Sequence, residues 1–277
     1  MRPQRWLGRG TPNGVSLAQA FTGINTCQWQ GKPGNYSHMK IVGIIPARLA
    51  STRLPRKMLR ELAGKPLVGW VYEAVRVSPL LADVIVATDS TEILEACRAH
   101  GWKAQMTSSS HRSGTERVHE ISNSLAADVY LNVQGDEPLV RPEQIATLLN
   151  VMKDQRAQVG TMKTACPTEE ICNPNAVKVV TASDGRALYF SRATIPFDRD
   201  ASAPRYFKHL GLYAYRKPAL DFFVSQPESA LEKSERLEQL RFLENGIPIY
   251  VGETAYDSVG VDTEDDLQRV AGILQGR

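Results

Sequence analysis

Basic and hydroxyl side chains crowd the stretch that follows the first apolar run of this sequence. Residues 41–46 are rich in isoleucine, and residues 47–57 then hold three arginines, one lysine and a Ser-Thr pair. Guanidinium, ammonium, hydroxyl and backbone N–H groups are the donors that polyphosphate oxygens accept from. The stretch therefore favours an anion-binding loop, although four cations alone would suit a solvated basic loop equally well. The candidate donors are Arg48, Ser51, Thr52, Arg53, Arg56 and Lys57.

Acidic residues follow two later apolar segments. Asp136 comes after the run 128–133, preceded by Gln134 and Gly135, and Asp262 follows a short apolar segment near the end of the chain. A carboxylate just past a buried strand, beside a glycine that lets the backbone approach, is well placed to hold a hard cation. Two such acids can share one ion, so the pair indicates a metal site. Turn chemistry and helix capping are the alternatives.

Strands and helices that could position these residues alternate through the first half of the chain. Runs of β-branched residues are typical of strands buried on both faces of a parallel sheet. Sheets of this kind are covered by helices and bind ligands at the carboxyl ends of their strands, where we expect the basic loop and Asp136 to meet. The predicted strands are 41–46, 83–88, 102–106 and 128–133, and the predicted helices are 66–77, 90–100, one behind a Ser113–Glu116 capping pattern, and 142–153.

The pattern changes after residue 157. Short strands follow one another without long helices, and prolines and an Asp-Gly pair interrupt them, which predicts antiparallel strands added to the sheet edge or forming a small subdomain. A lone histidine in such a strand, here His209, is more often a hydrogen-bonded core residue than a ligand. The predicted strands are 177–181, 187–190, 207–215 and 247–251, and the predicted helices are 229–245 and one behind a Thr263–Asp266 capping pair.

Composition narrows the class of protein. A chain of 277 residues can bury a full core as one large α/β domain or one domain with an insertion. Its net charge of +3 predicts neither nucleic-acid binding nor membrane insertion, and the four cysteines lack zinc spacing and favour a reducing compartment. Residues 1–38 show no periodic pattern. We interpret them as a disordered leader, a tag or a mis-called start, with Met39 as the natural first residue.

Seven motifs carry a family resemblance across the chain from Met39 to its end. They are IPARLASTRLPRK (45–57), HRSGTER (111–117), NVQGDEP (132–138), FSRATIP (190–196), KHLGLYAYR (208–216), ERLEQLR (235–241) and VDTEDDL (261–267). The first motif alone suggests only a nucleotide-sugar enzyme. In this order the seven resemble the CMP-sugar-acid synthetases, and among them the branch that activates 3-deoxy-D-manno-octulosonate (Kdo).

This resemblance implies an α/β fold, a Rossmann-like nucleotidyltransferase (GT-A-like) with a mainly parallel sheet and an antiparallel inserted subdomain. The cytidylyltransferase domain would span 39–277, and 157–228 would form the subdomain for the substrate and for dimer contacts. The implied reaction converts CTP and Kdo to CMP-Kdo and pyrophosphate for lipopolysaccharide synthesis. The implied setting is a Mg²⁺-dependent homodimer in the bacterial cytoplasm.

The resemblance also implies a role for individual residues, of which Arg48, Lys57, Asp136 and Asp262 would be catalytic. The CTP phosphates would meet Arg48, Ser51, Thr52, Arg53 and Lys57, and the nucleoside would meet Ala47, Ser113, Gly114 and Thr115. Mg²⁺ would be held by Asp136 and Asp262. The sugar acid would meet Gln134, Arg192, His209, Tyr213 and Glu238, with Arg192 facing its carboxylate and Glu235 as a weaker candidate than Glu238.

One position departs from the family pattern, and other functions remain as alternatives. Arg56 stands where the family commonly has glycine before the lysine. A CMP synthetase for the 8-amino analogue of Kdo or for a nonulosonic acid would share the motifs. A metal-dependent glycosyltransferase would share the sheet and the acid pair. A catalytically inactive regulator would usually have lost an acid or the lysine, and this chain retains Asp136, Asp262 and Lys57.

Overall fold

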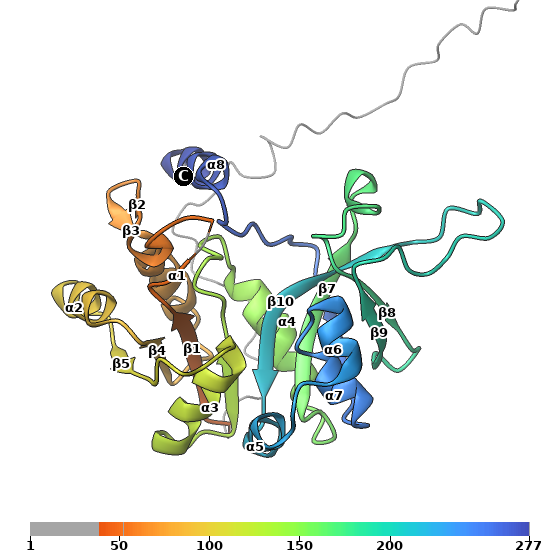
Figure 1. Cartoon of the computed structure of the whole chain (residues 1–277), viewed down its shortest axis with the longest axis horizontal. Helices are drawn as coiled ribbons and strands as arrows, with labels where there is room; N and C mark the ends of the chain where they lie inside the picture. The colour runs from red at the N-terminus through yellow and green to blue at the C-terminus, as the bar shows by residue number, and fades with distance from the viewer. Residues whose placement is uncertain (1–38, 52, 277) are drawn as a thin grey trace, which may run out of the picture.

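A central twisted sheet organises the chain, whose computed structural model describes residues 39–51 and 53–276 (Figure 1). The predicted leader 1–38 and Thr52 lie outside the described residues. The main path of the sheet runs in the order β11-β7-β10-β6-β1-β4-β5, and β8 and β9 branch from β10. The strands are β1 (Ile41–Ala47), β4 (Asp83–Thr88), β5 (Ala104–Met106), β6 (Val129–Asn132), β7 (Val159–Ala165), β8 (Lys178–Thr181), β9 (Ala187–Ser191), β10 (Phe207–Tyr215) and β11 (Ile249–Glu253), with β2 (Glu61–Leu62) and β3 (Lys65–Pro66) forming a separate pair.

Strand directions confirm a mainly parallel sheet with antiparallel strands in its second half. β1 runs parallel to β4 and β6, β4 to β5, and β11 to β7, whereas β10 is antiparallel to both β6 and β7. The prediction that these antiparallel strands add to the sheet edge is wrong for β10, which lies inside the sheet. Its residues are apolar on both faces: Leu210 and Leu212 pack in one core and Tyr213 and Tyr215 in the other.

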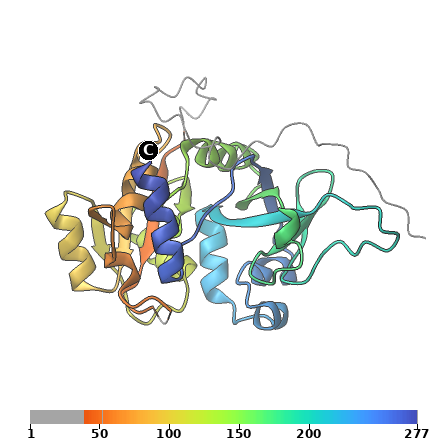
Figure 2. The same cartoon turned by 90° about the horizontal axis from the view of Figure 1, so that it is seen from above.

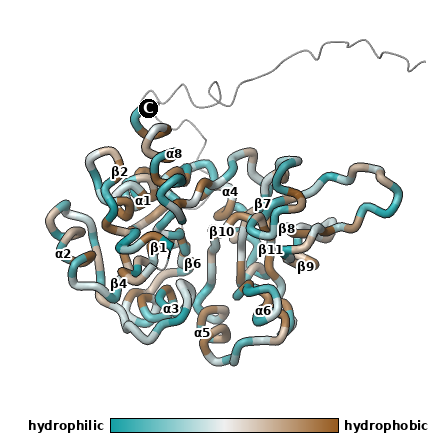
Figure 3. The backbone as a smooth tube through the Cα atoms, turned by 45° about the horizontal axis from the view of Figure 1, so that its top comes forward, coloured by the Kyte–Doolittle hydropathy of each residue, from teal (hydrophilic) through white to brown (hydrophobic). Residues whose placement is uncertain are grey.

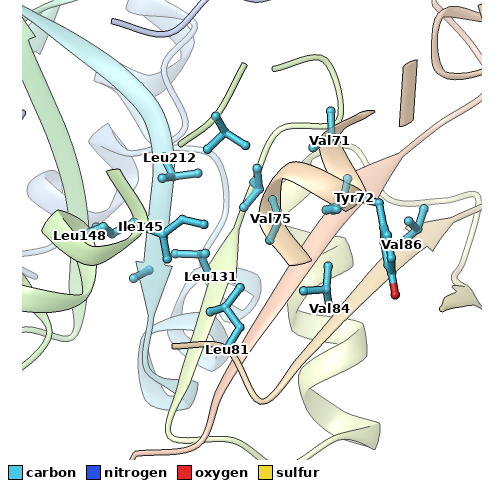
Figure 4. Close-up of a cluster of buried hydrophobic side chains, with 14 of the residues drawn as sticks. Val71, Tyr72, Val75, Leu81, Val84, Val86, Leu131, Ile145, Leu148 and Leu212 are labelled. Carbon is cyan, nitrogen blue, oxygen red and sulfur yellow. The ribbon is translucent and has the colours of Figure 1, made fainter. Parts of the chain in front are cut away.

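Helices cover both faces of the sheet. On one face lie α1 (Leu67–Arg76), α2 (Thr91–Ala99) and α4 (Pro142–Val151), and on the other α3 (Gly114–Ser124), α5 (Lys217–Ser225) and α7 (Leu240–Glu244). In the first core, Val71 and Val75 of α1 and Ile145 of α4 gather over Leu131 of β6 (Figure 4). The neighbouring Tyr130 points into the second core, because successive strand residues alternate between faces.

The last helix, α8 (Glu264–Gln275), packs against β2 and the start of α1, from the first part of the chain, rather than beside β11, which precedes it in sequence (Figure 2). Leu267 and Val270 of α8 join Leu54, Leu62 and Leu67 in a third apolar cluster. The Thr263–Asp266 capping box is confirmed, since Thr263 Oγ1 accepts from the Asp266 N–H and the Asp266 carboxylate accepts from the Thr263 N–H. This packing brings the residue before the cap, Asp262, to the loop that follows β1.

The single helix predicted over 229–245 is wrong. Two short helices, α6 (Ala230–Glu235) and α7, are separated at Arg236, whose backbone is left-handed at φ 53°. A left-handed residue ends the hydrogen-bond ladder of a helix. The break lets Glu235 turn toward β9, where its carboxylate accepts from the Ser191 hydroxyl at 2.5 Å and from the Arg192 N–H at 2.9 Å.

Residues 192–206, between β9 and β10, extend away from the body of the molecule (Figure 1). The outer end of this extension is mostly hydrophilic (Figure 3). It nevertheless contains Phe197, whose side chain is 86% exposed. Short 3₁₀ turns, η2 (Lys57–Leu59) and η3 (Thr168–Glu170), complete the architecture. Among the described residues, no helix is both long and apolar enough to cross a membrane.

Candidate active site

A cleft of about 240 Å³ opens at the carboxyl ends of β1 and β6. Four segments line it: the loop after β1, the start of α3, the loop after β6, and the segment before α8. The cleft therefore lies where ligands bind in open α/β sheets. Of the residues predicted from the sequence, those that line it are Arg48, Ser51, Arg53, Lys57, Ser113, Gly114, Gln134, Asp136 and Asp262.

The two predicted acids meet at one ammonium group in this cleft. Lys57 Nζ lies 2.5 Å from Asp136 Oδ2 and 2.9 Å from Asp262 Oδ1. The backbone joins the same two segments, because the Val261 N–H donates to the Asp136 carbonyl at 2.9 Å. Gly135 lets the loop after β6 lie close to the end of β1, since a Cβ there would stand 2.8 Å from the Pro46 carbonyl oxygen. Both carboxylates thus face the same point, although one comes from the middle of the chain and the other from near its carboxyl terminus.

The acid pair fits a hard cation that also binds phosphate. Mg²⁺ is commonly held by one or two carboxylates together with substrate phosphates rather than by a full set of protein ligands. Within the described residues, no group of three or more His, Cys, Asp or Glu side chains could hold a metal alone. Burial lowers the pKa of Lys57, but Asp136 and Asp262 outweigh that effect and raise it above its ordinary value. The point between the carboxylates is therefore electrostatically suited to positive charge.

Arginines of the loop after β1 face the same cleft. Arg53 Nη2 lies 2.9 Å from Asp262 Oδ2, with its side chain 65% exposed. Arg48 is exposed at the mouth of the cleft and makes no hydrogen bond or ion pair among the described residues. By contrast, Ala47 is fully buried at the end of β1 and does not line the cleft, so only its backbone could face a nucleoside.

The start of α3 forms the opposite wall. Ser113 caps the helix by accepting from the Glu116 N–H at 3.2 Å, as predicted. The reciprocal half of the capping box is missing, because the Glu116 carboxylate accepts from the Arg112 N–H instead, at 2.7 Å. Thr115 points away from the cleft: it is fully buried, and its hydroxyl donates to Glu238 Oε1 at 2.8 Å.

Our sequence reasoning missed two residues of the HRSGTER motif that shape this wall. Arg117 is only 4% exposed; it forms an ion pair with Asp89 and donates to the Thr107 hydroxyl at 2.7 Å. His111 lines the cleft and pairs with Glu120, which also accepts from the Ser108 N–H at 2.9 Å. The sequence did hold a signal for Arg117, which stands four residues before Ile121 and so shares its helix face, where a buried arginine needs an acidic partner.

Gln134 links the cleft to the strand that carries two predicted sugar-acid contacts. Its Nε2 lies 3.4 Å from the carbonyl oxygen of Gly211, which sits between His209 and Tyr213 on β10. The His209 and Tyr213 rings lie 5.4 Å apart. The Tyr213 hydroxyl and Glu238 Oε2 are buried without a hydrogen-bond partner among the described residues. Buried polar atoms of this kind are unusual in proteins and are candidates for ligand contacts.

Arg192 does not reach the cleft in this structure. Its Nε donates to the Glu235 carbonyl at 2.7 Å, and its Nη1 donates to the Pro174 carbonyl at 3.0 Å. Glu238 likewise lies apart from the cleft, among residues of α3, α6 and α7 around a second hollow. Of the five predicted sugar-acid contacts, the structure therefore brings only Gln134 to the nucleotide side, and His209 and Tyr213 adjoin it along β10.

His209 should make stability depend on pH. Burial lowers its pKa to about 3, and its Nε2 lies 3.0 Å from the Thr161 hydroxyl oxygen. An unfolded chain protonates histidine near pH ~6.5. Between those values the unfolded state binds more protons, so stability present above pH ~6.5 is lost as the pH falls. From pH 7 to 5, the free energy of unfolding should fall by about 1 to 2 kcal/mol because of this residue.

Chemical denaturation at pH 7, 6 and 5 measures this effect. His209→Gln retains a donor for Thr161 but cannot titrate, so its unfolding free energy should fall less steeply over that interval. Parallel pH curves for the two proteins would contradict the assignment of the pH dependence to His209.

Arg56, the departure from the family pattern, is explained by its backbone and its partner. Its φ of 57° is left-handed, a conformation that glycine adopts without strain. The side chain turns away from the cleft to form an ion pair with Glu92 near the start of α2. The extra charge therefore does not lie beside the predicted phosphate site.

Arg56→Gly should leave nucleotide binding nearly unchanged. Relief of the left-handed strain, about 1 kcal/mol, is opposed by the loss of an exposed ion pair and by the greater freedom of glycine in the unfolded chain. We expect a free energy of unfolding within about 1 kcal/mol of the parent and a KM for CTP within about two-fold. Arg53→Ala is the contrasting variant, expected to raise that KM about five-fold or more. Equal effects of the two variants would contradict this placement.

Together, the sheet, the basic loop after its first strand and the paired acids define a nucleotidyltransferase. The chain belongs to the cytidylyltransferase family, whose model matches residues 42–250. Enzymes of this family generally depend on a metal ion.

Within this family, the chain is most clearly similar to proteins named 3-deoxy-manno-octulosonate cytidylyltransferase. The chain is 63% identical to the protein of that name from Koribacter versatilis, over 86% of this chain and 92% of the relative. It is 54% identical to the one from Acidobacterium capsulatum, over 87% of this chain and 99% of that relative. A solved structure of CMP:2-keto-3-deoxy-manno-octonic acid synthetase in complex with CTP matches with a TM-score of 0.82 and 43% identity, over 85% of this chain and 98% of that one.

Proposed function

We propose that this chain transfers CMP from CTP to the anomeric hydroxyl of Kdo and releases pyrophosphate. The observation that carries the proposal is the meeting of Asp136 and Asp262 at one point, beside the basic loop that holds Arg48 and Arg53. That arrangement suits a metal-bound triphosphate. The identity to relatives named for this reaction over most of their length supports Kdo as the acceptor.

The transfer needs positioning and charge neutralisation more than covalent catalysis. The anomeric oxygen forms a bond to the α-phosphorus, the bond from that phosphorus to the oxygen that bridges it to the β-phosphorus breaks to release pyrophosphate, and the hydroxyl proton passes to solvent. Arg48 and Lys57 stabilise the charge on departing pyrophosphate, and Ser113 and Gly114 at the start of α3 frame the nucleoside. Mg²⁺, held by Asp136 and Asp262, would neutralise phosphate charge and lower the pKa of the attacking hydroxyl.

The sugar acid would lie along β10. Gln134 orients its hydroxyls from the cleft side, and His209 and Tyr213 continue the same surface. Glu238 supplies a buried carboxylate oxygen that has no partner among the described residues. Arg192 recognises the carboxylate of the sugar acid after exchanging its Pro174 contact for that ligand.

We also propose the setting implied by the family: a domain spanning 39–277 that works as a homodimer in the bacterial cytoplasm and supplies activated Kdo for lipopolysaccharide. The extended segment 192–206, with its exposed Phe197, supports the placement of dimer contacts in the 157–228 subdomain. Light scattering tests the oligomer. A solution mass near that of one 30.7 kDa chain would contradict it.

Pyrophosphate release tests the proposed reaction. The chain should release pyrophosphate from CTP only when both Mg²⁺ and Kdo are present, and CMP-Kdo should form in equal amount. The comparison acceptors are 8-amino-Kdo and a nonulosonic acid, and ATP, GTP and UTP serve as nucleotide controls. A higher kcat/KM with either comparison acceptor would move the function to that sugar acid. Sugar transfer from a nucleotide-sugar without pyrophosphate release would instead indicate a glycosyltransferase.

A further inference from the structure

A lysine with no solvent exposure lies next to the proposed carboxylate-binding arginine. Lys178 of β8 is 0% exposed, and its Nζ donates to the carbonyls of Asn173 at 2.8 Å, Ala176 at 2.6 Å and Arg192 at 2.8 Å. Burial lowers its pKa. No carboxylate of the described chain lies within ion-pair distance of it. A lysine ammonium has three donors, and here two of them meet carbonyls of the loop 173–176 and the third meets the Arg192 carbonyl.

Such a group needs an explanation beyond packing. An ammonium is costly to bury unless it is paired or fully hydrogen-bonded, and an apolar side chain of similar length would avoid that cost. The ammonium instead constrains geometry, because three backbone carbonyls must point at one nitrogen atom. Lys178 therefore fixes the loop 173–176 relative to the carbonyl of Arg192.

The contacts of Arg192 show what this geometry controls. The Glu235 carboxylate accepts from the Arg192 N–H at 2.9 Å, and Lys178 donates to the Arg192 carbonyl at 2.8 Å. Both backbone polar groups of Arg192 are therefore held. The side chain returns to the same loop, since Nη1 donates to the Pro174 carbonyl at 3.0 Å. Displacement of this loop would move the arginine backbone and the resting position of its guanidinium together.

We propose that Lys178 is a positioning residue that sets the place of Arg192 for recognition of the sugar-acid carboxylate. This inference rests on the proposed function, because it takes Kdo as the acceptor and Arg192 as the group that meets its carboxylate. Lys178 itself touches no substrate. Its influence passes through the Arg192 carbonyl and the 173–176 loop.

The chain offers a matched control in Lys163. Lys163, another buried lysine, is 8% exposed on β7; it donates to the Thr181 hydroxyl at 2.8 Å and makes no hydrogen bond to Arg192 or to the 173–176 loop. Lys163→Met and Lys178→Met remove the same charge from the same sheet and retain a flexible apolar stem. A purely structural role for buried lysines predicts similar effects of the two variants.

Steady-state kinetics of pyrophosphate release, with thermal unfolding in parallel, test the proposal. Lys178→Met should raise the KM for Kdo at least about ten-fold and change the KM for CTP less than about two-fold. Lys163→Met should leave both KM values near those of the parent. Lys178→Gln, which keeps two donors, should give an intermediate KM for Kdo and serves if the methionine variant does not fold.

A double-mutant cycle with Arg192→Gln tests directly whether Lys178 acts through Arg192. If Lys178 acts through Arg192, adding Lys178→Met to Arg192→Gln should raise the KM for Kdo no further. Additive effects, or equal increases in the KM for CTP and Kdo, would overturn the proposal. A parent protein that prefers another sugar acid would revise the proposed function alone, because the same cycle can then be run with that acceptor.

Discussion

Asp136→Asn and Asp262→Asn should each lower turnover by several orders of magnitude while the fold stays intact. An amide keeps the shape of the carboxylate but removes the charge that a hard cation requires. Only one carboxylate would then remain for a cation and for Lys57, whose Nζ now lies within 2.9 Å of both acids. Charge stabilisation of a phosphoryl-type transition state is the main catalytic contribution in such transfers.

Pyrophosphate release at saturating Mg²⁺ measures this loss, and thermal unfolding checks the fold. The matched control is Asp265→Asn, since Asp265 lies three residues after Asp262 but is exposed on α8 and lines no part of the cleft. It should retain the turnover of the parent. Release near the parental rate by either cleft variant would contradict the metal assignment.

The sequence was most informative where local pattern and burial agree. The runs 83–88 and 207–215 match β4 and β10 residue for residue, because their β-branched and aromatic residues are buried on both faces. The approach of the basic loop and Asp136 followed from one rule, that carboxyl ends of parallel strands share an edge, whereas Asp262 reaches the same point from the loop between β11 and α8 rather than from a strand. The structure brings the two acids together, and their role as metal ligands stays a prediction.

Long-range contacts account for what the sequence did not predict. The split between α6 and α7 depends on Glu235 meeting Ser191 and the Arg192 N–H of β9, a contact that no helical period encodes. The interior position of β10 depends on strand order, and local alternation says nothing about which strand becomes the neighbour. Lys178 was read only as part of a strand, because the three carbonyls that it binds converge only after folding.

Lys57→Met should remove two contributions of the cleft lysine, one to catalysis and one to neutralisation of the acid pair. Turnover should fall about 100-fold or more, because the ammonium no longer stabilises departing pyrophosphate. Without Mg²⁺ the variant should also unfold at a lower temperature than the parent, since Asp136 and Asp262 then face each other without their shared counter-charge. Their side chains are 29% and 43% exposed, so solvent screening keeps this loss to about 1 to 2 kcal/mol.

Addition of Mg²⁺ should restore much of the lost stability, because a divalent cation can take the place of the ammonium between the carboxylates. Thermal unfolding with Mg²⁺ and with a chelator should therefore show a larger metal-induced rise in Tm for Lys57→Met than for the parent. Lys208→Met is the matched control: Lys208 Nζ also joins two carboxylates, lying 2.7 Å from Glu170 and 3.0 Å from Asp257, but it lies outside the cleft. If Mg²⁺ raised the Tm of both variants equally, the point between Asp136 and Asp262 would not be the cation site.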